Sequence, residues 1–345
     1  MNQFTPIQFS NGKLILLDQR QLPSKEVFIE YDSIEGVYSG IKDMVVRGAP
    51  CIGFTAIFGM AIWIKNHPDF KLEQLIKAGS YLNEARPTAV NLGFEIQNVI
   101  EEIKRDQLSS DKAYERIVDL GFQKIAKSEE DNRNMAKTAE AELDSRLGQS
   151  RYKILTHCNT GFLACGSVGT ALGVVQNLHE KGKLENCWVD ETRPYLQGSR
   201  LTAYELNKLN APHKIVVEGA ASFLMKNKMV DAIFTGADRI AANGDTANKV
   251  GTSNLAVLAH YYNIPFCIVA PSSSFDTQIE SGEEIQIELR SAEEITKYNG
   301  QLIAPSTSEA YNPSFDITDG KLITGIISEK GIASGNYLET LKAIL

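Results

Sequence analysis

Five short apolar runs in the second half of the chain constrain its fold more than any other feature. They are YKILTH (152–157), NCWVDE (186–191), KIVVEG (214–219), DAIFTG (231–236) and PFCIVAP (265–271). Segments with helical periodicity lie between several of them, as in LQGSRLTAYELNKL (196–209) and NLAVLAHYYN (254–263). Strands that alternate with helices form a parallel sheet that is covered by helices on both faces. We therefore predict a Rossmann-like α/β domain for this half of the chain.

The first half of the chain predicts helices instead. Apolar residues recur at spacings of three and four, which is the helical period, in segments 33–46, 52–65, 72–85, 94–106 and 111–145. A strand-like stretch, GKLILLDQRQL (12–22), precedes these segments. With 345 residues, 43% of them hydrophobic, the chain is long enough for two cores. We expect a small-strand and helical domain over residues 1–130 and a Rossmann-like catalytic domain over residues 131–345.

Charge and residue usage narrow the classes of function. A formal net charge of −8 argues against binding to nucleic acid or anionic lipid through bulk charge. The N-terminal stretch lacks a signal-peptide pattern, and glycines or polar residues interrupt the apolar runs before bilayer length. We therefore expect a cytoplasmic protein with no membrane and no nucleic-acid partner.

Cysteine and histidine spacing gives no metal motif. The five cysteines form no CxxC pair, and most lie in apolar runs, so four of them are predicted to be buried free thiols. The five histidines show neither HxxxH nor HExxH spacing. No bound metal is expected.

Chemically suggestive residues follow three of the predicted strands. Cys158 follows the first strand, the segment 190–197 follows the second, and Asp238 follows the fourth. Ligands of such sheets bind beyond the carboxyl ends of the strands, where loops and helix N-termini meet. One cleft is therefore predicted to receive a thiol, a carboxylate and several anion-binding groups.

The stretch ILTHCNTGFLACGSVGTALGVV (154–175) reads as a buried strand, a turn with Cys158, and a glycine-rich helix. Its glycines, with Asp190 at the end of the next strand, invite comparison with a dinucleotide site. The tight GxGxxG is missing, however, and glycines inside a helix allow close packing on a sheet, so no nicotinamide cofactor is expected. A cysteine just before a helix N-terminus favours the thiolate. Spacing alone supports a catalytic and a core cysteine equally.

A candidate phosphate site stands near the start of the predicted helices. Arg47, Gly48 and Ala49 immediately precede Pro50, a residue suited to the first helical turn. Free amide groups beside a guanidinium suit a phosphate dianion. A tight turn with a surface arginine is the alternative.

The segment TGADRIAANGDTANKVGT (235–252) supplies further candidates. Apolar strand ends are predicted to enclose Asp238, which would raise the pKa of its carboxyl into the range useful for proton transfer. Helix capping, or pairing with Arg239, is the structural alternative. Asn248 and Lys249 are predicted at the start of a helix. There Lys249 is either solvated or a phosphate ligand.

Taken together, these stretches resemble the family that contains methylthioribose-1-phosphate isomerase, ribose-1,5-bisphosphate isomerase and the regulatory subunits of translation initiation factor 2B. The motifs that carry the resemblance are LLDQRQLP, VVRGAPCIG, ARPTAVNL, LTHCNTG, VDETRPYLQGSRLTAYEL, TGADRIAANGDTANKVGT, PSSSFD and NPSFDIT. Their joint order along nearly the whole chain is specific, although no single motif is decisive.

The resemblance implies an aldose–ketose isomerase that converts 5-methylthioribose 1-phosphate to 5-methylthioribulose 1-phosphate in methionine salvage, as a cofactor-free homodimer. It implies that Cys158 and Asp238 are catalytic. It also implies a set of residues that bind the phosphorylated sugar, namely Arg47, Gly48, Ala49, Arg86, Gln197, Asn248 and Lys249. Hydrogen transfer from carbon 2 to carbon 1 through an enediol and a direct hydride shift are both compatible with these residues.

Departures from the family pattern bear on the group at the sugar's fifth carbon. Glu218 and Gly219 replace an expected aspartate–asparagine pair, and unusual residues occur in three other motifs, at Cys165, Ser199 and Ser253. Ribose-1,5-bisphosphate isomerase is therefore kept as an alternative. A non-catalytic regulatory protein, like the initiation-factor subunits, is the other alternative, and the presence of both Cys158 and Asp238 argues against it. A methylthio group needs an apolar pocket, and the apolar candidates Phe162, Tyr195 and Leu196 favour it.

Overall fold

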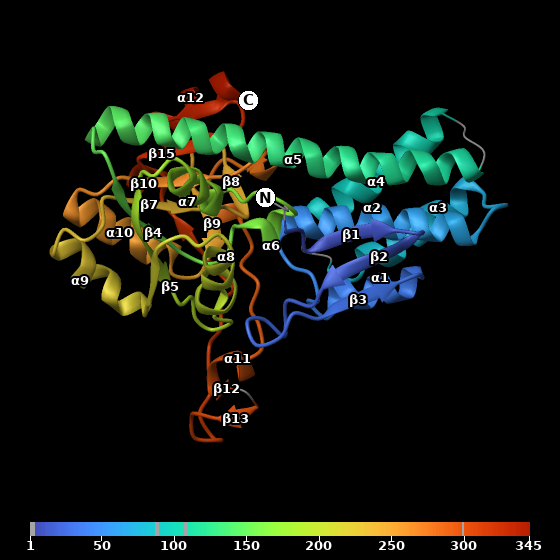
Figure 1. Cartoon of the computed structure of the whole chain (residues 1–345), viewed down its shortest axis with the longest axis horizontal. Helices are drawn as coiled ribbons and strands as arrows, with labels where there is room; N and C mark the ends of the chain where they lie inside the picture. The colour runs from blue at the N-terminus through green and yellow to red at the C-terminus, as the bar shows by residue number, and fades with distance from the viewer. Residues whose placement is uncertain (1–3, 87–89, 107–109, 299) are drawn as a thin grey trace. The chain divides into compact units, whose positions relative to one another are not determined.

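The computed structural model describes residues 4–86, 90–106, 110–298 and 300–345, and its contacts divide the chain into two compact units (Figure 1). Unit 1 comprises Met1–Glu130 and Gly161–Gly169, and unit 2 comprises Asp131–Thr160 and Thr170–Leu345. No sequence pattern indicated that Gly161–Gly169 would belong with the first half. As statements about parts that fold independently, the domains 1–130 and 131–345 remain proposals.

Unit 1 pairs a small antiparallel sheet with helices, which agrees with the predicted strand-like start and helical segments. The sheet consists of β1 (Ile7–Ser10), β2 (Lys13–Leu17) and β3 (Phe28–Tyr31). The helices are α1 (Ile34–Lys42), α2 (Ala49–Asn66), α3 (Leu72–Asn83), α4 (Val90–Asp106), the first part of α5 (Ser110–Leu147) and the short α6 (Phe162–Cys165).

Helix α2 is the core of unit 1. By length and composition α2 could cross a membrane, but 72% of it is buried inside the structure. All residues from Cys51 to Ile64 are buried. A helix that is apolar all round and covered by protein is a core helix.

Unit 2 contains a seven-stranded sheet in the order β16-β15-β10-β7-β4-β5-β6. Six strands run parallel and β16 pairs antiparallel with β15. The strands are β4 (Tyr152–Thr156), β5 (Leu184–Asp190), β6 (His213–Val216), β7 (Ala232–Thr235), β10 (Phe266–Val269), β15 (Gly325–Ser328) and β16 (Gly331–Ala333). The five predicted strands are therefore confirmed, together with the α/β class.

Helices cover both faces of this sheet, as predicted. On β4, Ile154 belongs to the apolar core under α5 and α7, whereas its neighbour Leu155 belongs to the core under α9, α10 and α12. This alternation is the two-residue period of a strand that is buried on both sides. The helical elements are α7 (Ala171–Glu180), the π-helix η1 (Gly198–Thr202), α8 (Ala203–Lys208), α9 (Ala221–Lys226), α10 (Thr252–Tyr262) and α12 (Tyr337–Ile344).

A second, four-stranded sheet in unit 2 overturns one prediction. It has the order β11-β8-β9-β14 and consists of β8 (Arg239–Ala241), β9 (Thr246–Lys249), β11 (Phe275–Asp276) and β14 (Phe315–Thr318). The prediction that Asn248 and Lys249 start a helix is wrong, because both lie on β9. Antiparallel pairing with β14, across more than sixty residues of sequence, holds them in a strand, and α10 begins only at Thr252.

The remaining elements of unit 2 are short. They are η2 (Glu218–Ala220), η3 (Ser272–Ser274), η4 (Gly282–Glu284), α11 (Glu293–Thr296), β12 (Lys297–Tyr298), β13 (Gln301–Leu302) and η5 (Gly320–Leu322). The hairpin of β12 and β13, together with α11, projects from the rest of unit 2 as an arm (Figure 1).

The strand order places the candidate residues at one edge of the large sheet. The chain moves from β4 to β5 and β6 on one side, then returns to the other side of β4 with β7 and β10. The carboxyl ends of β7, β4 and β5 are therefore neighbours, and the order reverses between β4 and β7. Such a reversal is where open α/β sheets bind ligands. The predicted convergence of these strand ends is confirmed.

Candidate active site

The turn after β4 holds Cys158 in an unusual backbone conformation. Its φ is +64°, in the left-handed region that residues with side chains adopt rarely. Its amide donates to Thr192 Oγ1 at 2.9 Å, and its carbonyl accepts from Thr202 Oγ1 at 2.6 Å. The Thr192 hydroxyl itself donates to the carbonyl of Asp190 at 2.9 Å. Hydrogen bonds from the loop after β5 and from η1 therefore hold this turn.

Burial separates Cys158 from the other thiols, as predicted. Cys158 is half-buried, whereas Cys51, Cys165, Cys187 and Cys267 are buried. Burial raises the pKa of the Cys187 and Cys267 thiols, which disfavours their reactive thiolate forms.

The glycine-rich helix predicted after Cys158 is wrong as a single element. Helix α6 has only four residues, and α7 starts at Ala171. Gly166 interrupts them with a φ of +94°, and a Cβ there would lie 3.2 Å from the Phe54 ring. Because one helical turn has only a small dipole, the dipole argument for a Cys158 thiolate loses its basis.

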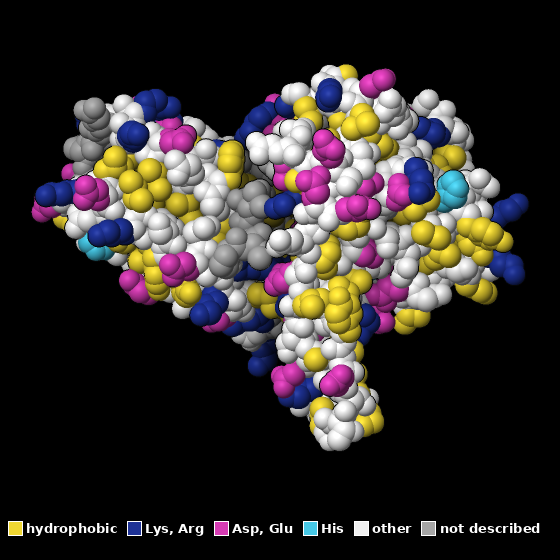
Figure 2. Space-filling model, turned by 180° about the vertical axis from the view of Figure 1, so that it is seen from behind, with side chains coloured by type: hydrophobic (Ala, Val, Ile, Leu, Met, Phe, Trp, Pro, Cys, Tyr) yellow, Lys and Arg dark blue, Asp and Glu magenta, His cyan; other side chains and the backbone are white. Residues whose placement is uncertain are grey.

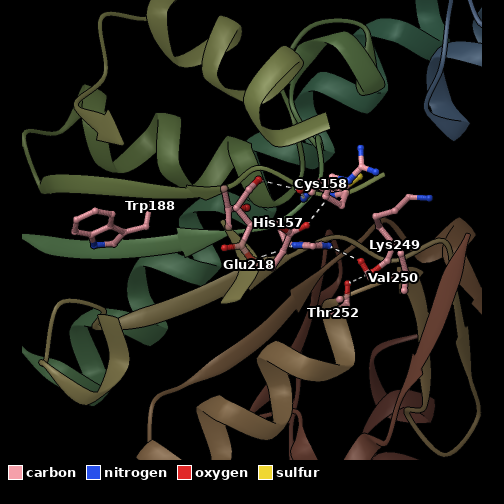
Figure 3. A network of polar contacts seen from close by, with 12 residues as sticks. His157, Cys158, Trp188, Glu218, Lys249, Val250 and Thr252 are labelled. Atoms are coloured by element: carbon pink, nitrogen blue, oxygen red, sulfur yellow. Dashed lines mark hydrogen bonds and ion pairs between the residues drawn. The ribbon is translucent and has the colours of Figure 1, made fainter. Parts of the chain in front are cut away.

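His157, labelled in Figure 3, forms a buried pair with Asp190 that the sequence had not indicated. His157 Nδ1 lies 3.2 Å from Asp190 Oδ2, and His157 Nε2 lies 2.9 Å from the carbonyl oxygen of Val250. Both side chains are fully buried. Burial raises the pKa of Asp190, and the contact with His157 opposes that rise. The available signal was weak: each residue ends, or directly follows, one of two neighbouring strands.

Gln197 lies at the start of the π-helix η1 and is buried. Its Oε1 has no hydrogen-bond partner among the described residues. The next residue is Gly198, where a Cβ would lie 1.6 Å from the Asp190 carbonyl oxygen, so only glycine fits. A π-helix frequently marks a functional site, and a buried acceptor without a partner suits a ligand hydroxyl.

Lys249 and Asn248 are both buried on β9. Lys249 Nζ donates to the Ser314 carbonyl at 2.7 Å and lies 4.6 Å from the centroid of the Phe315 ring. Asn248 Nδ2 donates to Thr252 Oγ1 at 3.0 Å. The solvated-lysine alternative is therefore wrong.

Asp238 lies in the loop between β7 and β8, and the structure corrects its expected surroundings. Its amide donates to the Ala247 carbonyl at 2.9 Å, which ties the loop to β9. The residue itself is exposed, because the chain leaves the large sheet here to start the small one. The predicted enclosure by apolar strand ends is wrong.

Three candidate residues of unit 1, Arg47, Gly48 and Ala49, lie at the N-terminus of α2. Gly48 is the N-cap with a φ of +88°, and no side-chain cap hydrogen bond is present. A Cβ on Gly48 would lie 2.5 Å from Ala164 Cα, so only glycine fits. Pro50 lies in the first turn and Arg47 is buried, which excludes the surface-arginine alternative. First-turn amides without a side-chain cap suit an anion.

Arg86 is half-buried and follows α3 in unit 1. The rest of its motif, at positions 87–89, lies outside the described residues. Across the described residues, no group of three or more His, Cys, Asp or Glu side chains is arranged to hold a metal ion.

Two of the residues that depart from the family pattern, Glu218 and Ser253, have hydrogen-bond partners in unit 2. Glu218 accepts a hydrogen bond from the Arg193 amide. Burial, and then the neighbouring Glu218 charge, raises the pKa of Glu191. Ser253 Oγ donates to Asp316 Oδ2 at 3.0 Å, at the start of α10.

Similarity to known proteins extends over the whole chain. A methylthioribose-1-phosphate isomerase of Aquifex aeolicus is 47% identical over 95% of this chain and 68% of its own length. Methylthioribose-1-phosphate isomerase 2 of Pseudothermotoga lettingae is 42% identical, covering 100% of this chain and 99% of the relative. The crystal structure of 5-methylthioribose 1-phosphate isomerase from Pyrococcus horikoshii superposes with a TM-score of 0.91 at 38% identity, over 100% of this chain and 96% of that one.

The initiation-factor branch is also represented. A structure titled translation initiation factor 2B, subunit delta, from A. fulgidus has a TM-score of 0.88 at 33% identity and covers 99% of both chains. A tetrameric initiation factor 2B complex from C. thermophilum, 14% identical with a TM-score of 0.57, shares the fold. Residues 45–335 match the model of the Initiation factor 2 subunit family. The chain therefore belongs to the Initiation factor 2 subunit family.

Proposed function

We propose that this protein is an aldose–ketose isomerase that converts 5-methylthioribose 1-phosphate to 5-methylthioribulose 1-phosphate in methionine salvage. The observation that carries this proposal is the full-length similarity to relatives named for this activity, at 42% and 47% identity. The thiol and the carboxylate that such a reaction needs follow neighbouring strands, β4 and β7.

The chemistry starts with ring opening, because the 1-phosphate prevents the spontaneous opening of a free aldose. Asp238 donates a proton to the ring oxygen as the bond from that oxygen to carbon 1 breaks. In the enediol route, the Cys158 thiolate removes the proton from carbon 2 and returns it to carbon 1, while the Asp238 carboxylate takes the proton of the carbon 2 hydroxyl. In the hydride-shift route, hydrogen moves with its electron pair from carbon 2 to carbon 1 while the Cys158 thiolate removes the proton of the carbon 2 hydroxyl, so carbon 2 becomes the ketone. In this second route Asp238 ends deprotonated and Cys158 protonated, so one net proton transfer between them restores the enzyme.

The remaining candidate residues bind the sugar phosphate in this proposal. Arg47, Gly48 and Ala49 offer a guanidinium and helix-start amides, and Arg86 and Lys249 offer further cations. Gln197 and Asn248 supply amide groups for the sugar hydroxyls.

The test is to incubate purified protein with 5-methylthioribose 1-phosphate without added metal or NAD and to identify the ketose by mass spectrometry and NMR. We expect turnover that a chelator does not reduce. Loss of activity with a chelator, restored by a divalent ion, would contradict the cofactor-free scheme. No turnover of any sugar phosphate would favour the regulatory, initiation-factor-like role that the delta-subunit similarity raises.

Deuterium at carbon 2 distinguishes the two transfer routes. A hydride shift retains the label at carbon 1, whereas an enediol allows exchange with water. The product isotope ratio in water therefore decides between them.

A bisphosphate substrate is the second candidate within the isomerases. A pair of cations that could bind a 5-phosphate favours it. The Tyr195 ring has two guanidinium groups beside it, Arg200 at 4.7 Å and Arg290 at 5.8 Å from the ring centroid. Both cations have protein partners, since Arg200 donates to the Tyr195 carbonyl and Arg290 binds Glu294. We therefore expect a higher kcat/KM for 5-methylthioribose 1-phosphate than for ribose 1,5-bisphosphate in a side-by-side assay. The reverse order would replace the substrate and leave the isomerase class intact.

We further propose a cytoplasmic homodimer. Large apolar side chains are exposed on β6, directly after it, and on α9 and α10, namely Ile215, Val217, Phe223, Val257 and Tyr261. Figure 2 shows hydrophobic side chains gathered on the surface of unit 2. An exposed apolar patch of this kind is typical of a protein interface. Light scattering after size-exclusion chromatography should give twice the mass of the 38.0 kDa chain. In Phe223→Glu, the measured mass should fall toward that of a single chain.

A further inference from the structure

We propose that His157 and Asp190 share one proton and act as a positioning pair. The pair fixes the Cys158 thiol relative to Lys249, which binds the phosphate in the proposed function. The inference rests on the proposed function, in which Cys158 and Lys249 serve the same substrate. All groups that carry the argument lie within unit 2.

The His157 ring connects two segments that carry candidate residues. Along the chain, His157 directly precedes Cys158, and the accepting carbonyl of Val250 directly follows Lys249. One ring therefore joins the end of β4 to the segment between β9 and α10. The dashed line between His157 and Val250 in Figure 3 marks this link.

Asp190, at the end of β5, connects a third strand to the hydrogen bonds around His157. Its Oδ2 contacts His157 Nδ1, while its carbonyl accepts from the Thr192 hydroxyl that in turn accepts the Cys158 amide. Asp190 at the end of β5 thus holds the His157 ring, and Thr192 just after β5 holds the peptide group between His157 and Cys158. The left-handed conformation at Cys158, which costs about 1 kcal/mol or more, persists because these bonds determine it.

Hydrogen-bond chemistry sets the number of protons in the pair. A backbone carbonyl only accepts, so His157 Nε2 must carry a hydrogen. The contact between Nδ1 and Asp190 Oδ2 then needs one proton, on either atom. An imidazolium facing a carboxylate and an imidazole facing a carboxylic acid both satisfy this count, and both have zero net charge. Removing that proton would leave a buried negative charge, which is strongly unfavourable.

The surrounding chain accommodates this ring specifically. At Gly251 a Cβ would lie 2.8 Å from His157 Cε1 and 3.1 Å from Nε2, and the φ of +104° also favours glycine. Asp316 holds the same segment by accepting from the Gly251 amide at 2.7 Å. A ring of this size, with a hydrogen-bonded nitrogen at each end, therefore sets the separation between Cys158 and Lys249.

Two substitutions separate the two contacts of the ring. Asp190→Asn keeps the shape of the side chain and removes the shared proton. His157→Asn keeps an amide near the Nδ1 position and removes the contact with Val250. Because misplacement of reacting groups by about 1 Å costs up to a hundredfold in rate, we expect each to lower kcat roughly tenfold to a hundredfold, with a smaller change in KM. His179→Asn is the matched control, since that histidine also contacts a backbone carbonyl in unit 2 and should leave kcat unchanged.

Thiol alkylation gives a readout that does not need turnover. Cys158 is half-buried and the other four cysteines are buried, so iodoacetamide should label it first, and Cys158→Ala should remove this fast phase. Its alkylation rate should change several-fold in His157→Asn and Asp190→Asn but not in His179→Asn. Unchanged kcat and unchanged labelling in folded variants would overturn the proposal.

NMR of the unsubstituted protein with ¹⁵N-labelled histidine tests the proton count directly. We expect a protonated Nε2 on His157 and a strongly downfield proton between Nδ1 and the carboxyl group. A His157 ring with Nε2 unprotonated would overturn the proposal even if both variants failed to fold. If the wild-type protein turns over no sugar phosphate, the proposed function fails, and labelling and NMR still decide whether the pair positions Cys158.

Discussion

Unit 2 contains two polar networks that differ in burial and in completeness. The first lies at the carboxyl edge of the large sheet and joins His157, Asp190 and the Cys158 turn. The second lies between α5 and the end of α7, where Glu140 accepts hydrogen bonds from Asn177 and from two lysines, Lys181 and Lys183. The first is almost entirely buried, whereas the lysines of the second reach solvent.

This difference in hydrogen bonding indicates that the first network serves function and the second serves stability. In the first network, Asp190 Oδ1 is buried and has no hydrogen-bond partner among the described residues. A buried polar atom in this state costs about 1–3 kcal/mol, so the network is a poor way to stabilise a sheet. Glu140, by contrast, has partners on both oxygens. We therefore expect changes at the first network to alter catalysis and changes at the second to alter only stability.

The largest effect is expected at Cys158. Cys158→Ala should lower kcat by at least about a hundredfold, the scale for removing a positioned base, while the melting temperature stays close to that of the parent protein. Cys187→Ala on β5 is the matched control, because that thiol is fully buried and outside the turn. Equal turnover of Cys158→Ala and the parent would end the catalytic assignment.

Asp238 belongs to neither network, and its exposure makes it the sharpest test of the proposed chemistry. Asp238→Asn should lower kcat by about a hundredfold if this carboxyl group protonates the ring oxygen. We expect the variant to fold, because it retains the backbone amide whose hydrogen bond ties the loop to β9. Near-normal turnover of a folded Asp238→Asn protein would show that another group is the acid.

A smaller effect, on binding, is expected at Lys249. Lys249→Met removes a charge-assisted hydrogen bond to phosphate, worth about 1.5–3 kcal/mol, so KM should rise roughly tenfold to a hundredfold. Lys214→Met is the matched control, because Lys214 also lies over an aromatic ring, that of Trp188, at 5.5 Å but is exposed on β6. An unchanged KM for Lys249→Met would place this lysine outside the phosphate site.

The sequence predicted the parts of this fold that local patterns determine. The five apolar runs became β4, β5, β6, β7 and β10 because a strand buried on both faces must be apolar along its length. Pro50 marked the first turn of α2 because its fixed φ suits that position. The strand ends met as expected, since parallel strands share one carboxyl edge.

The errors arose where distant residues decide the structure. Residues 248 and 249 resemble a helix start, yet pairing with β14 makes them a strand. Asp238 looked enclosed because the apolar run before it is buried, but the chain turns into a second sheet at that point. Nothing in the local pattern at His157 shows which way its ring points, so the pair with Asp190 was missed.

The smallest effect is expected at the second network, as a pH dependence of stability. Burial alone would raise the pKa of Glu140, but hydrogen bonds from Lys181, Lys183 and Asn177 lower it to about 2, from an ordinary value of 4.5. A folded pKa below the unfolded one means that this stabilisation is present above pH 4.5 and is lost as pH falls toward 2. Because both lysines reach solvent, we expect only about 1 kcal/mol.

Denaturant titrations of Glu140→Gln between pH 7 and the acid limit of folding measure this contribution. The free energy of unfolding should be lower than that of the parent at pH 7, and the difference should shrink below pH 4.5, with kcat unchanged throughout. Glu142→Gln is the matched control, since Glu142 forms a surface pair with Arg146 one helical turn along α5, and its curve should follow the parent. A Glu140→Gln protein with normal stability and reduced kcat would contradict the assignment of the second network to stability alone, because Glu140 would then affect catalysis.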